Sequence, residues 1–141
     1  MILNTLIVIF TFFFMEFVAW FAHKYVMHGF LWFLHKDHHQ VDHNKKFQKN
    51  DYFFLIFAIP SILCFVYGVE NYSFLFFIGI GIALYGLAYF IIHEIIIHRR
   101  LPPPSKTKNK YIIAIRKAHK IHHKNRNKEH CINFGMLIVP R

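Results

Sequence analysis

Acidic residues and cysteines are scarce in this sequence. Only 7 Asp and Glu stand against 17 Lys and Arg, which gives a formal net charge of +10. Of the two cysteines, Cys64 lies inside an apolar run and Cys131 lies outside it, so we expect no disulfide. A G-x-G-x-x-G fingerprint is also missing, which argues against a bound flavin or nicotinamide nucleotide. Any redox chemistry in this chain would therefore need electrons from outside.

Charge is almost absent from three long apolar runs. Ile2 to Ala22 contains 21 residues with Glu16 as the one charge, while Tyr52 to Val69 and Tyr72 to Ile92 are uncharged runs of 18 and 21 residues. Because about 20 apolar residues span the hydrocarbon core of a bilayer, we predict an all-α integral membrane protein with three transmembrane helices. A fourth crossing would require the segment from Tyr72 to His98 to bend at one of its glycines and re-enter the membrane.

With 141 residues, the chain is expected to form one membrane-embedded domain, residues 1–141. The first run lacks a basic n-region and a small-x-small cleavage site, so we interpret it as a retained anchor. Glu16 lies seven residues before His23 and hence on nearly the same helical face. An ionisable residue inside a membrane is a candidate functional residue; the alternative is a structural hydrogen bond to a neighbouring helix.

The basic residues predict how the helices are oriented. Five lysines lie between Lys24 and Lys49, twelve Lys and Arg lie between Arg99 and Arg141, and Glu70 is the only charge between the second and third runs. Both basic segments follow an odd number of crossings, so the positive-inside rule places both on the cytoplasmic face of the cytoplasmic membrane. We attribute the net charge to this asymmetry and to anionic lipid headgroups or an acidic protein, and expect no nucleic-acid partner.

Histidine is abundant and its spacing repeats. Ten of the 12 histidines form two copies of the pattern H-x4-H followed by H-x2-H-H. On an α-helix, each H-x2-H-H cluster could aim three ring nitrogens in one direction. The H-x4-H pairs are separated by about 7.5 Å along the axis and about 140° around it, which suits two ions or a helix that breaks, as Gly29 would allow. We predict that ten imidazoles share two metal ions: His23, His28, His35, His38, His39, His93, His98, His119, His122 and His123.

The last part of the chain is expected to cap this histidine cluster. Ile112 and Ile115 are in register with His119, which predicts an amphipathic helix over residues 111–123 that lies along the membrane interface. The stretch from Cys131 to Pro140 is apolar again, and we expect it to pack under the site.

Five segments carry a family resemblance: MEFVAWFAHKYVMHG, HKDHH, HEIIIHRR, HKIHH and CINFG. In this order and spacing, from Met15 to Pro140, they resemble the bacterial beta-carotene 3-hydroxylases within the fatty acid hydroxylase and sterol desaturase superfamily of non-haem di-iron membrane oxygenases. The chain differs from that pattern at Glu94, where relatives often have Asp. This difference removes no predicted ligand. It affects the expected substrate more than the expected type of reaction.

The resemblance implies two iron ions, O2 as co-substrate, and conversion of beta-carotene through beta-cryptoxanthin to zeaxanthin. It also implies a ferredoxin-type electron donor, which would dock on the basic face. The spacing alone does not identify the metal, because imidazole binds iron, copper, zinc and nickel. Glu16 and Glu94 would support the metal ligands without binding metal, and one or two of the ten histidines could do the same.

Two other functions remain open at the level of sequence. A related enzyme that acts on a sterol or a fatty acyl lipid, or a carotenoid ketolase, would keep the metal site and change the product. A metal-transporting or metal-storing membrane protein would also need histidines. Transporters, however, place their ligands near the bilayer midplane within broken helices, whereas these clusters lie at the predicted helix ends.

Overall fold

The computed structural model describes residues 1–42, 44–45, 47–100 and 107–139. Every regular element in this described part of the chain is a helix. In chain order these are α1 Ile2–Phe21, η1 Ala22–Phe30, α2 Trp32–His39, η2 Lys49–Phe54, α3 Leu55–Gly68, α4 Phe74–Tyr89, η3 Phe90–Ile97 and α5 Lys110–Lys124. The prediction of an all-α protein is confirmed.

Three helical segments are long and apolar enough to cross a membrane: Ile2–Phe30, Lys49–Gly68 and Phe74–Ile97. They correspond to the three apolar runs, which makes this chain an integral membrane protein. The described residues give no fourth crossing, because the helix from Phe74 to Ile97 continues through all of its glycines. Gly79 and Gly81 serve close helix packing instead of a bend.

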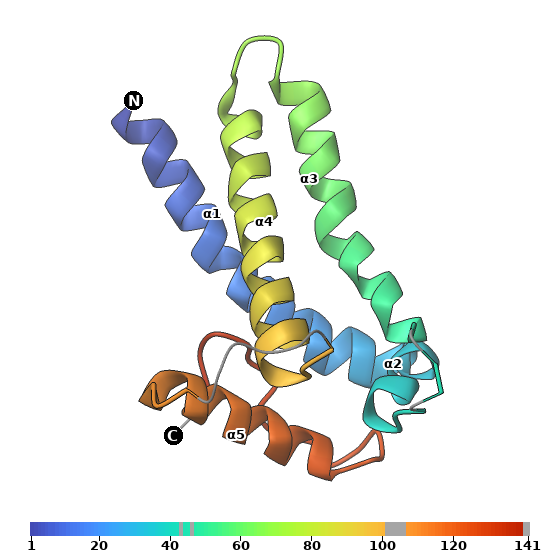
Figure 1. Ribbon diagram of the computed structural model, residues 1–141. Helices are drawn as coiled ribbons and strands as arrows, with labels where there is room; N and C mark the ends of the chain where they lie inside the picture. Colours follow the sequence, from blue (N-terminus) through green and yellow to red (C-terminus); the bar gives the residue numbers. More distant parts are fainter. Residues whose placement is uncertain (43, 46, 101–106, 140–141) are drawn as a thin grey trace.

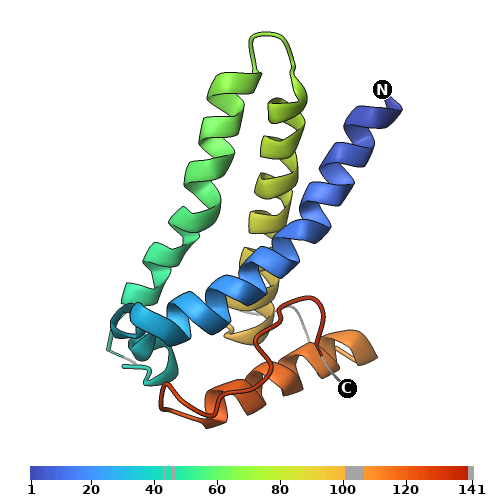
Figure 2. The same cartoon turned by 180° about the vertical axis from the view of Figure 1, so that it is seen from behind.

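The long helices meet the short ones at one end of the molecule (Figures 1 and 2). α3 and α4 form an antiparallel hairpin, and α1 crosses α4 and contacts it. At the end opposite the hairpin turn, α2 and η2 lie together, and α5 lies crosswise below the ends of the long helices (Figure 1). The predicted amphipathic helix therefore caps the end of the bundle that carries the histidines. Asn109 begins α5, since its side chain accepts the backbone N–H groups of Tyr111 and Ile112.

Small residues let the long helices approach closely. A Cβ atom added to Gly81 in α4 would lie 2.6 Å from Cβ of Thr11 and 2.9 Å from the carbonyl oxygen of Val8, both in α1. On the other side of α4, the Ser61 hydroxyl of α3 donates a hydrogen bond to the carbonyl oxygen of Gly79 at 3.0 Å. Such contacts stabilise membrane helices, because lipid provides little hydrophobic driving force for helix association.

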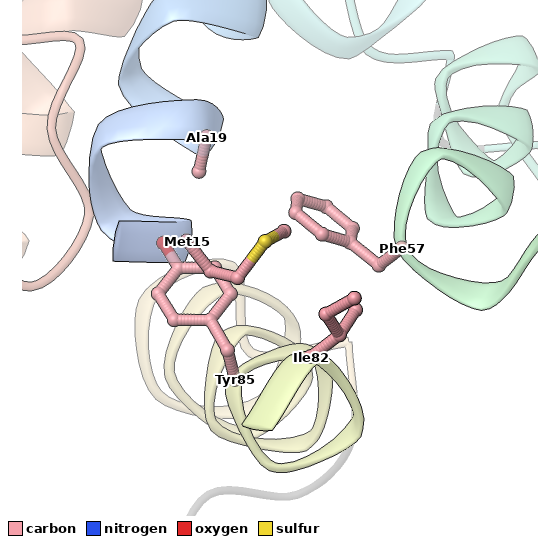
Figure 3. Packing of buried hydrophobic residues seen from close by; sticks show 5 residues of the cluster. All are labelled: Met15, Ala19, Phe57, Ile82 and Tyr85. Carbon is pink, nitrogen blue, oxygen red and sulfur yellow. The ribbon is translucent and has the colours of Figure 1, made fainter. Parts of the chain in front are cut away.

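A small apolar core joins the three long helices (Figure 3). Met15 and Ala19 of α1, Phe57 of α3, and Ile82 and Tyr85 of α4 are buried together. Tyr85 is fully buried, and its hydroxyl donates a hydrogen bond to Glu16 at 2.7 Å. The core lies just before the helix ends, so it fixes the relative positions of the histidines that follow on α1 and α4.

Substitution of Gly81 by Ala is expected to destabilise the bundle. The overpacking cost, about 1–3 kcal/mol, should exceed the gain of about 1 kcal/mol in helix propensity. The measurement is thermal unfolding of the purified protein in detergent. Gly86→Ala is the matched control, because its added Cβ would meet only Cβ of Phe57, at 3.8 Å. An equal loss of stability in both variants would contradict close packing at Gly81.

Candidate metal centre

Two π-helical segments carry the H-x4-H pairs. The backbone N–H of Leu31 donates to the carbonyl of Val26 at 3.0 Å, and that of His98 donates to the carbonyl of His93 at 2.9 Å, both five residues apart. An i to i+5 hydrogen bond places residues five apart one above the other, as the i to i+4 bond does in an α-helix. The ring centres of His23 and His28 are accordingly 5.3 Å apart, and those of His93 and His98 are 4.5 Å apart.

This geometry corrects the sequence interpretation of the H-x4-H pairs. The ligand atoms of His23 and His28 lie close enough together to share one ion, and the helix does not break between them. Gly29, directly after His28, is the residue with a non-helical backbone, at φ −97° and ψ −124°. The chain kinks there before α2, and the ring of His35 in α2 lies 5.1 and 4.9 Å from the rings of His23 and His28.

The histidines converge in two groups, each with its ligand atoms within 4.8 Å of one another. The first group is His23, His28, His35, His39 and His122. The second group is His38, His98, His119 and His123. The tenth histidine, His93, is buried beside the second group, with its ring centre 4.5 Å from His98 and 4.9 Å from His119. All ten predicted histidines therefore meet at one end of the bundle.

The H-x2-H-H clusters are divided between the groups, although their spacing would have allowed all three nitrogens of a cluster to point one way. In α2, His35 and His39 join the first group and His38 joins the second. In α5 the division is reversed, since His122 joins the first group while the histidines on either side of it join the second. Both helices lie between the two groups, so residues four apart face one group and the residue between them faces the other.

An oxygen atom orients each ring of the first group. His23 and His28 donate Nδ1–H to the backbone carbonyls of Phe134 and Lys128, at 3.0 and 3.1 Å. The other three Nδ1 partners in this group are Asn50 Oδ1 for His35, Asn125 O for His39 and Ile132 O for His122, at 2.6, 2.9 and 2.8 Å. These oxygens only accept hydrogen bonds, so Nδ1 must carry the proton in all five rings. Each Nε2 then presents a lone pair.

The Nε2 atoms have the properties of metal ligands. Those of His23, His35, His38, His39 and His123 are buried and have no hydrogen-bond partner among the described residues. The Nε2 atoms of His28 and His122 are 3.2 Å apart, although neither carries a proton to share. Buried lone pairs that face one another are costly without a partner, and a cation between them removes that cost. The residues therefore fit a metal ion.

Burial also keeps these imidazoles neutral. It lowers the pKa of His39 to about 4 and that of His98 and His122 to about 3. The pKa of His119 is also well below its ordinary value because of burial and the neighbouring imidazoles His93 and His98. Only the unprotonated ring can bind a metal, so the environment selects the form that binds.

The turn formed by Gln48 and the start of η2, between α2 and α3, supports both groups. Within it, Asn50 Oδ1 accepts from His35 of the first group, and Gln48 Oε1 accepts from His38 of the second, at 2.6 and 2.9 Å. The turn is held by Asp37, whose carboxylate accepts the backbone N–H of Lys49. Sequence analysis missed Gln48 and Asn50, because polar residues in a loop have no spacing that marks them.

A carboxylate lies behind His93. His93 donates Nδ1–H to Glu94 Oε1 at 2.5 Å, and Arg100 donates to Glu94 Oε2 at 2.8 Å. Arg100 also binds Asp51 through both of its terminal nitrogens, at 2.6 and 3.1 Å. Glu94 is thus in direct contact with a candidate ligand. Glu16, in contrast, binds Tyr85 and the backbone of residues 136–138.

The sequence is similar to those of known hydroxylases. The sequence matches the fatty acid hydroxylase family over residues 8–140. The beta-carotene hydroxylase of Pantoea ananas is 40% identical over 137 residues, which cover 97% of this chain and 78% of that protein. The beta-carotene hydroxylase of Paracoccus sp. (strain PC1) is 35% identical over 136 residues, 96% and 83% of the two chains.

A plant relative matches in part. The chloroplastic beta-carotene 3-hydroxylase 2 of Arabidopsis thaliana is 31% identical over 131 residues, 90% of this chain and 42% of that protein. No solved structure matches this chain. Because the family match spans almost the whole sequence and the bacterial relatives align over most of their own length, this protein is an enzyme of the fatty acid hydroxylase family.

Proposed function

We propose that this protein is a beta-carotene 3-hydroxylase, which uses O2 to convert beta-carotene through beta-cryptoxanthin to zeaxanthin at two histidine-bound iron ions. The observation that carries the proposal is the convergence of nine histidines into two groups, with His93 beside the second, at one end of a bundle of membrane-crossing helices. The names of the relatives support the substrate. The whole chain, residues 1–141, would act as one domain.

Each group of histidines would hold one iron ion. The first group offers five nitrogens and the second offers four, with His93 beside it either as a further ligand or as support. Iron, when bound, supplies the oxidising power from O2 that a hydrocarbon C–H bond requires, because such a bond offers nothing to an acid or a base. Related chemistry on sterols or acyl lipids would need the same site.

The residues of the chain fix and shield the reaction site. Oxygen partners of Nδ1 hold the imidazoles in one orientation, and that orientation sets the direction of each Nε2 lone pair. The ring of Phe134 packs against His23, His28 and His122, with ring centres 5.1–5.4 Å apart, and keeps water from that side. Tyr89 packs against His93 on the membrane side, with ring centres 5.0 Å apart. A lipid-soluble substrate would approach along this apolar side.

We place the site at the cytoplasmic face of the cytoplasmic membrane, since the positive-inside rule assigns the basic end to the cytoplasm. Exposed lysines lie on α5, the helix that also carries His119, His122 and His123: Lys110, Lys117, Lys120 and Lys124. An acidic, ferredoxin-type donor fits this surface by charge and would deliver electrons close to the metal ions.

Expression of this chain in a bacterium that accumulates beta-carotene tests the substrate. We expect pigment extracts to contain 3-hydroxylated carotenoids with the native chain and none with His38→Ala at equal protein level, because the variant lacks a ligand of the second group. Liquid chromatography with mass spectrometry identifies the products. Unchanged beta-carotene in cells with well-expressed, iron-loaded protein and a competent donor would contradict the carotenoid assignment and direct the search to sterols and acyl lipids.

Iron content tests the two groups separately. After dialysis against a weak chelator, we expect about two iron ions per native chain, one for each group, and about one in His35→Ala or His119→Ala, which each remove a ligand from one group. Metal analysis of the purified protein gives the ratio. His130→Asn is the control, because His130 is exposed and belongs to neither group. Loss of both ions from His35→Ala and from His119→Ala, with both ions retained in His130→Asn, would contradict this division.

Acidification is expected to release the metal and destabilise the protein. In the unfolded chain the histidine pKa is about 6.5, whereas burial lowers the pKa of His39 to about 4 and that of His98 to about 3. The unfolded state therefore binds protons first as the pH falls. The stability from these neutral histidines is complete above about pH 6.5 and is lost progressively below it.

Bound iron and the unfolding temperature, measured across that range, report this loss. The variant His130→Asn should give the native profile, because His130 is exposed. A flat profile between about pH 7.5 and 5 would contradict the burial of neutral imidazoles.

A further inference from the structure

Glu16 binds a segment of the chain that is far away in sequence. One oxygen of its carboxyl group, Oε1, accepts the backbone N–H groups of Met136, Leu137 and Ile138 at 2.9, 2.9 and 3.0 Å. The other oxygen accepts the Tyr85 hydroxyl at 2.7 Å. Glu16 is buried, and three successive amides aimed at one oxygen form an anion-binding nest. Nothing in the proposed chemistry uses this carboxyl group directly.

The bound segment, residues 131–139, is named here the C-terminal strap. Its backbone carbonyls at Ile132 and Phe134 accept Nδ1–H from His122 and His23, at 2.8 and 3.0 Å. Only Gly135 separates Phe134 from the three amides that Glu16 holds. The strap therefore connects a carboxylate in the membrane helix α1 to two candidate ligands of the first histidine group.

The strap depends on such anchors, because it forms no helix or strand of its own. Asn133 has a positive φ of 62°, and a Cβ atom on Gly135 would collide with the carbonyl oxygen of Ile138. A tight turn with left-handed backbone at a non-glycine residue is costly unless its surroundings hold it. Besides Glu16, the Tyr111 hydroxyl of α5 holds the strap by donating to the carbonyl of Leu137 at 2.7 Å.

The second group is supported by other residues. His38 donates Nδ1–H to Gln48, and His93 beside it donates to Glu94. Among the described residues, the strap orients no ring of the second group. Displacement of the strap should therefore disturb only one of the two groups.

We propose that Glu16 is a positioning residue for the first metal ion, and that it acts through the strap. By fixing the amides of residues 136–138, it holds the carbonyls of Ile132 and Phe134 where they orient His122 and His23. This inference rests on the proposed function, because it takes the first histidine group as a metal site. It also explains why the CINFG segment accompanies the histidine clusters: the segment supplies the two carbonyls and the turn.

Ferrous iron titration of the metal-free protein against a chelator tests the proposal, with Glu16→Gln and Glu16→Ala beside the native chain. We expect one of the two ions to bind about 10–100-fold more weakly in both variants, more so in Glu16→Ala, while the other ion keeps its native affinity. Hydrogen exchange provides a second readout in the metal-free protein. The amides of residues 136–138 should exchange faster in both variants, since their acceptor is weakened or removed.

Tyr85→Phe is the matched control. It removes the hydrogen bond to Oε2 and leaves the three amide bonds to Oε1, so both ions and the exchange of the strap should remain as in the native chain. An equal effect of Tyr85→Phe would assign the role to helix packing and overturn the proposal. Native affinity for both ions in both Glu16 variants would also overturn it, as would equal weakening of both ions. A native chain that binds no iron would instead refute the proposed function, and this inference with it.

Discussion

The hydrogen bond from histidine Nδ1 to an oxygen is the interaction on which the site depends. Seven of the ten converging histidines make it, to three kinds of partner: backbone carbonyls, the side-chain amides of Asn50 and Gln48, and the carboxylate of Glu94. Each bond fixes the proton on Nδ1 and leaves a lone pair on Nε2. Many uncharged rings can be buried together only because one nitrogen is satisfied by the protein and the other is left for a cation.

The two copies of the histidine pattern are interlocked. The first copy supplies four members of the first group and sends His38 to the second, while the second copy supplies three members of the second group, with His93 beside them, and sends His122 to the first. Neither half of the chain completes a group alone. The hairpin of α3 and α4 separates the copies in sequence, so both groups form only when α1, α4 and α5 are assembled correctly.

Much of this arrangement could be predicted from the sequence, because run length and ligand spacing are local properties. The apolar runs predicted the three crossings, and the repeated spacing predicted which histidines converge. The division of His38 and His122 could not be predicted, since it depends on how α2 and α5 lie between the groups. Ile132 and Phe134 orient His122 and His23 through their backbone carbonyls, and every residue has such a carbonyl, so their side chains did not identify them. For Glu16, the sequence is compatible with two roles, and its bond to Tyr85 is a structural hydrogen bond between α1 and α4.

The π-helical segments have a consequence for how this sequence can vary. Four residues lie between the two histidines of each pair, so the histidines are five positions apart, and each segment contains a backbone hydrogen bond that also spans five positions. Deletion of one residue there would still leave two histidines facing each other, now in an ordinary α-helix. The deletion would, however, rotate the residues that follow the segment and draw them closer: α2 after the first segment, or Arg100 after the second. Insertions and deletions should thus be rare within these pairs among relatives and common in the turn between α3 and α4. The number of residues in each π-helical segment is therefore constrained by the geometry of the site.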